Sequence, residues 1–333
     1  IIDQSIDTGL LFFGAHNNKI VANTISNSEL DGVYLVGCNN NTFYHNNFID
    51  NLEQVWISPD SLNNSWNSTY PTGGNYWSDH TEDVDQNKGP NQDQPGSDGI
   101  WDHPYVIDEN NNDTYPLVHL WRGHIIIDKA LVSDNRCDIG SEQTVSFHAK
   151  WSLTGSDVTV GDIYVNGTSC PLNGTGWACF TTPTYVTVGK RLWTVTEVFA
   201  DYMTTYEKVV DDPYIIWDKV NLTLDITDNR INVGDTADIT WTGVYAYDNS
   251  DFTGTLGGFN DTLTKSTVGK YWFTVVSITD PIHGLNKFEN NSVYCIFDKV
   301  TITLVVEDDW IDVNSMASIT TSGVYQYNNE IYD

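Results

Sequence analysis

The sequence predicts an all-β protein: the C-terminal coils of a right-handed parallel β-helix with a loop-rich cap, followed by tandem Ig-like β-sandwich domains. Aromatic residues make up 13% of the chain and only two methionines occur, while β-branched residues are abundant, a composition that suits pleated, half-buried strands. Two internal repeats support this class. One has a period of 23 residues near the start, and the other recurs after 80 to 90 residues.

The 23-residue repeat lies in residues 1–69, where residues 9–14 align with residues 32–37. Asn pairs recur at the same interval, at residues 17–18, 40–41 and 63–64. Short strands between such pairs are typical of a parallel β-helix, in which coils stack at about 4.8 Å and equivalent Asn side chains form amide ladders. A leucine-rich solenoid is disfavoured because the repeated Leu positions and helical segments are lacking.

The stretch after the coils, residues 70–121, is expected to form a cap, because an open last coil leaves unpaired backbone groups. Gly73 and Gly74 permit backbone conformations that other residues avoid. Tyr76 and Trp77 beside them supply large apolar area at a tight bend. We therefore predict that the chain turns sharply here and covers the last coil.

An acidic loop lies within the predicted cap and is opposed only by Lys88. Closely spaced carboxylates repel one another unless they are solvated or bridged by a cation, and Ca²⁺ takes six to eight oxygen ligands in flexible geometry. The candidate calcium ligands are Asp83, Asp85, Asn87, Asp93, Asp98 and Asp102. The first three have the spacing that opens an EF-hand loop, but the glycine falls late and no Glu closes the loop. A solvated acidic loop without an ion is the alternative.

From residue 122 the chain repeats a unit of 80 to 90 residues: the phrase Ile127-Asp128-Lys129 returns as Trp217-Asp218-Lys219 and as Phe297-Asp298-Lys299. Alternating strands within each unit lie between turn signals at roughly ten-residue intervals, which is typical of an Ig-like β-sandwich. The predicted units are Ig-like domains at residues 122–216 and 217–297 and a partial one at residues 298–333. The third is too short to close a sandwich, so either further chain or a strand from another subunit is expected to complete it.

Acidic residues outnumber basic ones by 45 to 15, which leaves a formal net charge of −30. Nucleic acid and anionic lipid require clustered Lys and Arg, so the composition disfavours both as partners. No apolar run long enough for a membrane span and no basic-then-apolar leader is present. Both ends fall inside repeats, and we expect the polypeptide to be longer.

N-x-S/T sequons occur in every region of the chain. The predicted glycosylation sites are Asn40, Asn63, Asn67, Asn112, Asn166, Asn173, Asn221, Asn260 and Asn290. Their spread indicates a secreted glycoprotein.

Cysteine usage is sparse. Cys170 and Cys179 bracket a turn-rich loop and are predicted to form a hairpin disulfide, with two unpaired thiols as the alternative. Cys38 and Cys295 are expected to be small buried apolar residues, and Cys137 has no evident partner.

The cap carries a family resemblance. Its matching segments are residues 73–79, 97–100, 104–108 and 115–117. They resemble the tail that closes NosD-like parallel β-helix domains, of the carbohydrate-binding or sugar-hydrolase type, in archaeal cell-surface proteins. The resemblance covers about residues 1–120, and His80 and His103 depart from it. The later repeats resemble the Ig-like arrays that follow such β-helix domains, which implies a cell-surface location.

Together these features predict an extracellular structural glycoprotein of a cell-surface layer, filament or sheath, self-assembling and adhesive. The expected partners are other copies of the chain, other cell-surface proteins and glycans. The alternative is a carbohydrate-binding or polysaccharide-active protein that uses the β-helix face. Aromatic residues that would either stack on sugars or form the core are Trp56, Trp66, Tyr70, Tyr76, Trp77 and Trp101.

No catalytic residue is assigned. Within the coils the only basic residue besides histidine is Lys19, whereas a lyase needs a base beside its metal. Asp31 and Asp50 lie on successive coils but are offset within the repeat, so nothing marks them as a glycosidase pair. We therefore predict that the protein is not an enzyme.

Overall fold

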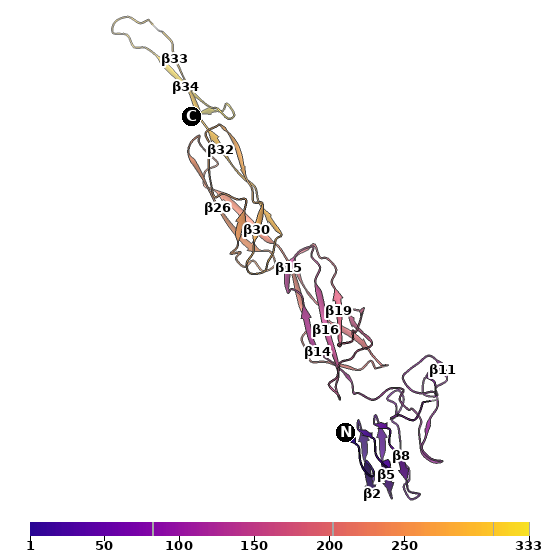
Figure 1. Cartoon of the computed structure of the whole chain (residues 1–333). Coiled ribbons are helices and arrows are strands. Elements are labelled where there is room, and N and C mark those ends of the chain that lie inside the picture. Colours follow the sequence, from indigo (N-terminus) through magenta and orange to yellow (C-terminus); the bar gives the residue numbers. More distant parts are fainter. Residues whose placement is uncertain (82, 202, 309, 333) are drawn as a thin grey trace. The chain divides into compact units, whose positions relative to one another are not determined.

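The computed structural model describes residues 1–81, 83–201, 203–308 and 310–332, and every regular element in them is a β-strand (Figure 1). The predicted all-β class is confirmed. No described segment is a helix long and apolar enough to cross a membrane. The chain divides into two compact units; the first holds residues 1–131, 145–180 and 193–213, and the second holds residues 132–144, 181–192 and 214–333. The domain boundaries expected from the sequence stay predictions.

Three parallel sheets form the coils at the start of the first unit. They consist of β1 (Ile2–Asp3), β4 (Thr24–Ser26), β7 (Asn47–Ile49) and β9 (Tyr76–Trp77); of β2 (Leu10–Phe13), β5 (Asp31–Val36) and β8 (Glu53–Ile57); and of β3 (Lys19–Val21) and β6 (Thr42–Tyr44). Ile2 pairs with Ile25 and Ile25 with Phe48, so the register advances by the 23 residues of the sequence repeat. This is the strand pairing of a parallel β-helix, and β2, β5 and β8 lie side by side in Figure 1. The right-handed turn of the coils stays a prediction.

The Asn pairs form the corners of the coils. The first Asn of each pair has a positive φ, which Asn tolerates better than most residues; these are Asn17 (60°), Asn40 (59°) and Asn63 (55°). The second Asn builds the predicted amide ladder, since Asn18 Nδ2 donates to Asn41 Oδ1 and Asn41 Nδ2 donates to Asn64 Oδ1, each at 3.0 Å. The two members of a pair therefore have different roles, one in the backbone turn and one in the stacking of coils.

A second ladder ends on a buried carboxylate in the cap. Asn46 Nδ2 donates to Asn75 Oδ1 at 2.9 Å, and Asn75 Nδ2 donates to Asp113 Oδ2 at 3.3 Å. Asp113 Oδ2 also accepts from the Asn75 backbone N–H at 2.6 Å and from Trp77 Nε1 at 2.9 Å. A Cβ at Gly74 would collide with this carboxylate, so glycine is required there. Burial raises the pKa of Asp113 to about 7, against the N–H donors, which lower it.

Aromatic side chains fill the coil interior beneath the cap. Phe43 stacks on Trp66 with ring centroids 4.3 Å apart, and Phe48 stacks on Trp77 at 4.4 Å. Both tryptophans are buried, so they are core residues rather than sugar platforms. The rest of the cap holds two short hairpins, β10 (Asn87–Lys88) with β11 (Gln94–Pro95) and β12 (Tyr105–Val106) with β13 (Asn112–Asp113).

Two further sheets belong to the first unit. One contains β19 (Trp177–Thr181), β16 (Thr144–Trp151), β14 (Ile125–Val132) and β22 (Tyr206–Lys208); the other contains β18 (Thr168–Pro171), β17 (Asp162–Val165) and β21 (Val195–Phe199). Alternate residues of these strands, such as Ile125 and Ile127 in β14, are fully buried. The period of two confirms that each sheet turns one face inward.

The second unit repeats a sandwich plan. Its sheets are β15 (Arg136–Asp138), β23 (Tyr214–Asp218) and β20 (Gly189–Leu192); β28 (Thr262–Thr264), β26 (Thr236–Tyr245), β24 (Val220–Ile226) and β31 (Phe288–Asn290); β25 (Arg230–Asn232), β32 (Val293–Asp298) and β29 (Gly269–Phe273); β27 (Thr255–Gly257) and β30 (Ser277–Thr279); and β33 (Val300–Val306), β34 (Ile319–Tyr325) and β35 (Ile331–Tyr332). Ile239 of β26 shares a buried cluster with Phe273 of β29 and Phe297 of β32. The second and third of these sheets therefore pack face to face, as in a β-sandwich.

Candidate functional site

A buried arginine holds two elements of the second unit together. Arg136 in β15 donates through Nε and Nη2 to Asp218 Oδ2, at 3.0 and 2.6 Å. Its Nη1 and Nη2 also donate to the two carboxylate oxygens of Asp248, at 3.1 and 3.2 Å. The guanidinium carbon lies 4.5 Å from the centroid of the Tyr245 ring. We call these four residues the first arginine clamp; it joins the sheet of β15 and β23 to the turn that follows β26.

The carboxylate at the centre of this clamp has partners on both oxygens. Asp218 is fully buried, and its Oδ1 accepts from the backbone N–H groups of Lys219 and Tyr247, at 2.8 and 2.9 Å. The Arg136 guanidinium holds the pKa of Asp248 well below its usual range. Burial lowers the pKa of Arg136, but its hydrogen bonds to Asp248 and Asp218 outweigh this and raise it. The clamp is therefore a charged, hydrogen-bonded network.

The same arrangement recurs one repeat later. Arg230 in β25 lies with Nε 3.7 Å from Asp298 Oδ2 and Nη1 3.4 Å from Glu330 Oε2, and its guanidinium carbon is 4.5 Å from the Tyr325 ring. Asp298 Oδ1 accepts from the backbone N–H groups of Lys299 and of residue 327, at 2.8 and 3.0 Å, as Asp218 does. Arg230, Asp298, Tyr325 and Glu330 form the second arginine clamp.

The second clamp has longer contacts and a more solvent-exposed arginine than the first. The Arg230 side chain is 25% exposed, against 9% for Arg136. Among described residues, Asp298 Oδ2 accepts no hydrogen bond, whereas Asp218 Oδ2 accepts two. Both clamps nevertheless connect a sheet to the hairpin that begins the next repeat. A further contact supports the first: Asp138 Oδ1 accepts from the backbone N–H groups of residues 286 and 287, each at 2.8 Å.

Sequence reasoning found the repeated Asp-Lys phrase but missed the arginines that bind its Asp. Arg136 precedes Asp218 by 82 residues, so no local spacing joins them. The available signal was a second repeat, Asp-Asn-Arg at residues 134–136 and 228–230, in a chain with 15 basic residues. An aspartate in one repeated phrase and an arginine in another, both recurring with the modules, indicate an ion pair.

The coils and the sheets that follow them in the first unit meet at Trp121. The backbone N–H of Trp121 donates to Asn47 Oδ1 at 2.7 Å, and Asn47 Nδ2 donates to the Trp121 carbonyl at 3.0 Å. The indole stacks on the His45 ring, with centroids 3.4 Å apart. Burial lowers the pKa of His45, so its ring stacks in the neutral form. This contact fixes the chain as it leaves the cap.

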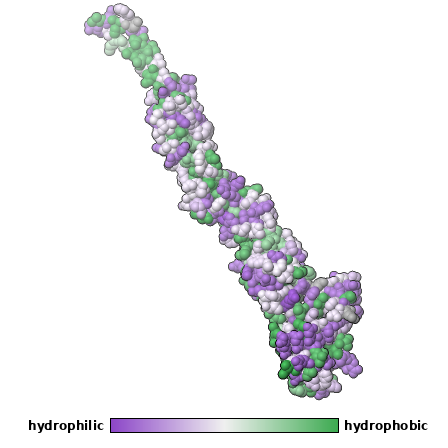
Figure 2. Space-filling model, viewed as in Figure 1, coloured by the Kyte–Doolittle hydropathy of each residue, from purple (hydrophilic) through white to green (hydrophobic). Residues whose placement is uncertain are grey.

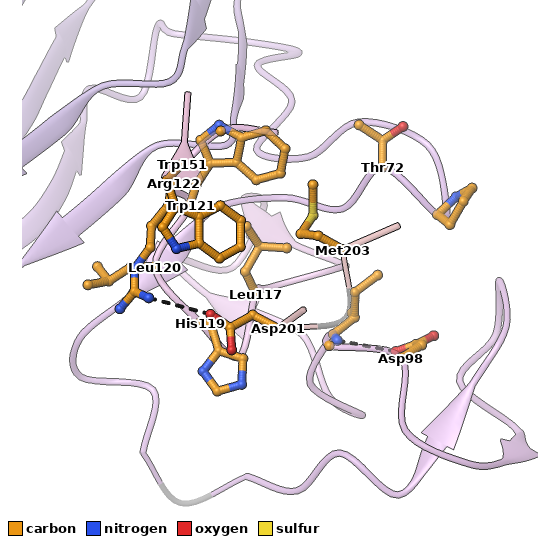
Figure 3. Close-up of a pocket in the computed structure, with 14 residues that line it drawn as sticks. Thr72, Asp98, Leu117, His119, Leu120, Trp121, Arg122, Trp151, Asp201 and Met203 are labelled. Atoms are coloured by element: carbon orange, nitrogen blue, oxygen red, sulfur yellow. Dashed lines mark hydrogen bonds and ion pairs between the residues drawn. The ribbon is translucent and has the colours of Figure 1, made fainter. Parts of the chain in front are cut away.

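A cavity of about 70 Å³ lies beside this contact (Figure 3). Its wall includes Leu117, Trp121, Trp151 and Met203, and the Arg122–Asp201 ion pair crosses it with Nη1 and Oδ2 3.4 Å apart. Ligand pockets for metabolites are usually several hundred Å³ in volume. The cavity is therefore too small for such a ligand and has room for only a few water molecules.

The six residues predicted as calcium ligands do not form one ligand set. Asp85 accepts from the backbone N–H groups of Asp98 and residue 99, at 3.1 and 3.0 Å, and Asp102 accepts from Asn87 Nδ2 at 2.7 Å. Asp93 is exposed. In the part of the chain that the structure describes, no group of three Asp, Glu, His or Cys side chains has an arrangement that could hold a metal. Calcium binding stays a prediction.

Asp83 faces two histidines instead of the other carboxylates. His103 Nδ1 lies 2.7 Å from Asp83 Oδ1, and His80 Nε2 lies 3.2 Å from Asp83 Oδ2. The hydrogen bond to Asp83 raises the pKa of His103. His103, one of the two positions at which the family resemblance breaks, therefore hydrogen-bonds a carboxylate that the sequence assigned to calcium.

The predicted disulfide is wrong. Cys170 and Cys179 are both free thiols; Cys170 is buried and Cys179 is exposed. Cys170 lies in β18, which pairs with β17, whereas Cys179 lies in β19, which pairs with β16, so the two cysteines belong to different sheets.

The predicted glycosylation sites lie mostly at the surface. The Asn side chain is exposed at seven of them, and half-buried at Asn67 and Asn221. Asn67 Oδ1 accepts from the backbone N–H of residue 114 at 3.3 Å, which ties that side chain to the cap. Glycosylation itself stays a prediction.

A comparison with known protein families gives a match in the coil region. Residues 2–82, less than half of the chain, match the family described as periplasmic copper-binding protein (NosD). Copper prefers imidazole and sulfur ligands. In the matched segment His45 Nε2 lies 2.6 Å from the carbonyl of residue 72 and Cys38 is buried, so within the described residues these side chains form no copper site. No curated protein matches the chain.

Solved structures similar to this chain include intimin and two bacterial adhesins. They include the D0-D1 domain of intimin, at 14% identity over 50% of this chain and 97% of that chain with a TM-score of 0.20. The adhesin FdeC of Escherichia coli is 12% identical over 62% of this chain and 75% of that chain, with a TM-score of 0.27. The adhesin InvE of Yersinia pseudotuberculosis is 14% identical over 51% of this chain and 58% of that chain, with a TM-score of 0.23. Similarity at this level supports no inference about function.

Proposed function

We propose that the chain is part of an extracellular structural protein of a cell-surface layer, filament or sheath, adhesive and without catalytic activity. The observation that carries the proposal is the recurrence of the arginine clamp, with Arg136 on Asp218 and Arg230 on Asp298. A structural protein has to transmit force or position from one module to the next, and the clamp is a joint between modules.

The clamp suits this task because its geometry is specific. A guanidinium that binds two carboxylates and lies on an aromatic ring loses most of its contacts if the modules rotate. Burial of the first clamp adds to this, since a buried carboxylate that loses its cation is strongly destabilised. Flexible linkers rich in Gly, Ser or Pro are the usual alternative between modules. Here β23 and β24 are separated by one residue, Lys219.

The acidic composition supports an extracellular, well-hydrated surface. A net charge of −30 keeps separate copies soluble until a specific contact forms. The predicted glycans would add to this hydration at exposed corners such as Asn40 and Asn63. An archaeal source, implied by the resemblance of the cap, stays a prediction.

Electron microscopy of the native material tests the proposal. We expect ordered layers, filaments or sheaths that an antibody against the chain labels on intact cells. Dispersed monomers that degrade a polysaccharide would contradict the structural role and favour the enzymatic alternative. Surface labelling without any ordered assembly would contradict the self-assembling part of the proposal.

A further inference from the structure

A buried histidine lies between two carboxylates in the first unit. His148 of β16 has its Nδ1 2.5 Å from Asp128 Oδ1 and its Nε2 3.1 Å from Asp157 Oδ1. Its side chain is 7% exposed. The turn at Gly176 covers the ring so closely that a Cβ on this glycine would lie 3.0 Å from Nε2. We call Asp128, His148 and Asp157 the histidine bridge.

The groups that face this histidine come from each element packed against it. β14 contributes Asp128, the hairpin after β16 contributes Asp157, and β19 contributes Trp177, whose ring centroid is 5.0 Å from that of the imidazole. Lys150 of β16 lies with Nζ 2.9 Å from Asp128 Oδ2. Lys129 Nζ lies 6.0 Å from the centroid of the Trp177 ring. The imidazole is therefore enclosed by two carboxylates, one of them shared with a lysine, and by an indole.

Both ring nitrogens can donate to their carboxylates only when the ring carries two protons. Neutral imidazole has one N–H group, whereas the imidazolium ion has two. Burial raises the pKa of Asp128, but hydrogen bonds from His148 and Lys150 outweigh this and lower it, so this carboxylate stays ionised. A neutral ring would keep its one N–H on Asp128, the nearer and more buried carboxylate, and would lose the hydrogen bond to Asp157, which is 45% exposed.

The third member of the bridge lies in a hairpin, residues 152–157, that supports the chain where it leaves the cap. The Ser152 N–H donates to the His124 carbonyl at 2.9 Å, and the Leu153 N–H donates to the carbonyl of residue 122 at 3.1 Å. The hairpin is thus bonded on one side to the histidine bridge and on the other to the segment that leads from the cap into the first sandwich. A change in the bridge therefore affects this connection.

The next module has the same hairpin without the titratable ring. β16 and β26 are each followed by a hairpin with an equivalent strand bridge, between residues 150 and 157 and between residues 244 and 251. On this alignment His148 corresponds to Thr242, whose partner in β24 is Thr223. Two hydroxyl groups do not change charge with pH, so this hairpin is a matched comparison for the first.

We propose that the histidine bridge makes the connection between the cap and the first sandwich depend on pH. Imidazole changes charge between pH 5 and 8. In the acidic part of this range the imidazolium ion donates to both carboxylates and holds the hairpin against β14 and β16. As the pH rises the ring releases a proton, Asp157 loses its donor, and the hairpin opens more often.

The bridge is expected to stabilise the hairpin in acidic rather than in alkaline solution. The folded state benefits from the second proton, because both N–H groups then have acceptors. This stabilisation is present at low pH and is lost as the pH rises. The arginine clamps of the later modules keep their charge over the whole range, because guanidinium is not deprotonated in proteins. The pH response needs no self-assembly, so it is independent of the proposed structural role.

Hydrogen exchange of the full chain at pH 5.5 and at pH 8, corrected for the intrinsic pH dependence of exchange, tests the proposal. The amides of the first hairpin donate to carbonyls across it, and so do those of the later hairpin. The amides to compare are those of Trp151 and Val158 in the first hairpin and those of Tyr245 and Phe252 in the later one.

Two variants remove the bridge and one is a control. His148→Thr copies the residue of the later module, and Asp157→Asn is the milder change that keeps the ring in place. His124→Gln removes the other histidine at this hairpin, whose Nδ1 lies 3.1 Å from Ser152 Oγ and whose Nε2 lies 3.2 Å from a Glu207 oxygen. The control shows which of the two histidines causes a pH response.

We expect the protection of the first hairpin to fall about tenfold from pH 5.5 to pH 8, the worth of one hydrogen bond to a charged group, while that of the later hairpin is unchanged. His148→Thr and Asp157→Asn should lose this difference, and His124→Gln should keep it. Equal protection of the first hairpin at both pH values would overturn the proposal, as would a response that survives in His148→Thr. Nitrogen NMR of the His148 ring gives a second measurement: we expect two protons at pH 5.5, and a neutral ring at that pH would overturn the proposal.

Discussion

The second unit contains the same hairpin twice, once covered and once uncovered. Strands β24 and β26 pair from Val220 with Tyr245 onward, and β33 and β34 pair from Val300 with Tyr325 in the same register. Leu224 is 2% exposed in the first hairpin, whereas its counterpart Leu304 is 65% exposed in the second. Figure 2 shows apolar side chains gathered on the surface at β33 and β34.

The comparison shows that strand pairing is determined by the sequence of the hairpin itself, whereas burial is determined by the elements packed against it. Both copies adopt the same strand pairing, although Asp225 and Gly234 of the first are replaced by Val305 and Asn314 in the second. Burial comes from the neighbours of the hairpin. Leu224 shares a buried cluster with Val275, Ile278 and Leu285, and Ile239 at the other end of the hairpin shares one with Phe273 and Phe297. The clamps follow the same trend, since the arginine side chain is 9% exposed in the first clamp, at the covered hairpin, and 25% exposed in the second.

The largest difference is expected between the two clamps. Arg136→Met leaves the Asp218 carboxylate buried without its cation and should lower the free energy of unfolding of the second unit by about 3–5 kcal/mol. Arg230→Met should cost less, about 1 kcal/mol, because Arg230 is 25% exposed and its Nε lies 3.7 Å from Asp298 Oδ2, too far for a hydrogen bond. Hydrogen exchange of the β24 and β26 amides in increasing urea measures both. Equal losses would mean that burial does not distinguish the clamps.

The two hairpins should respond differently to loss of the same side chain. Leu224→Ala opens a cavity in a packed core and should cost about 3–4 kcal/mol, whereas Leu304→Ala should cost less than about 0.5 kcal/mol. Urea denaturation of both variants checks this. A large loss for Leu304→Ala would show that a partner sheet covers β33 and β34 in solution.

A third contrast concerns two buried carboxylates. Asp218 has a guanidinium partner, whereas Asp113 in the cap accepts hydrogen bonds from neutral N–H groups, and burial raises its pKa to about 7. Because the folded state then holds a proton that the unfolded state has released, stability of the first unit should fall as pH rises from about 4 to 7. The expected loss is roughly 3 kcal/mol. Asp113→Asn should remove this pH dependence; a pH-independent wild type would contradict the raised pKa.

The smallest expected effect is that of calcium on the acidic loop. The loop carboxylates already accept backbone N–H groups, so the ion would add about 1 kcal/mol at saturating concentration. Differential scanning calorimetry with calcium and with EDTA measures it, and Asp98→Asn should abolish the shift. An identical thermal unfolding midpoint in both buffers would show that the loop does not bind calcium.

Local repetition explains which parts of this structure could be predicted. The 23-residue period determines the pairing of Ile2 with Ile25, and the doubled Asn predicts the ladder through Asn41. The disulfide prediction failed because it considered loop length but not that the strands of Cys170 and Cys179 join different sheets. The clamps were missed because Arg136 and Asp218 are far apart in the sequence and meet only after the sheet of β15 and β23 has formed.

The central claim is that the first arginine clamp holds two modules in a fixed arrangement. The most direct test is the width of the distribution of distances between two spin labels, one on each side of this clamp. Spin labels on unnatural amino acids at positions 187 and 262, which lie in exposed segments before β20 and in β28, leave the five native cysteines untouched. We expect one narrow distribution for the wild type and for the control Arg191→Met, and a broad one for Arg136→Met. A wild-type distribution as broad as that of Arg136→Met would show that the clamp does not hold the modules.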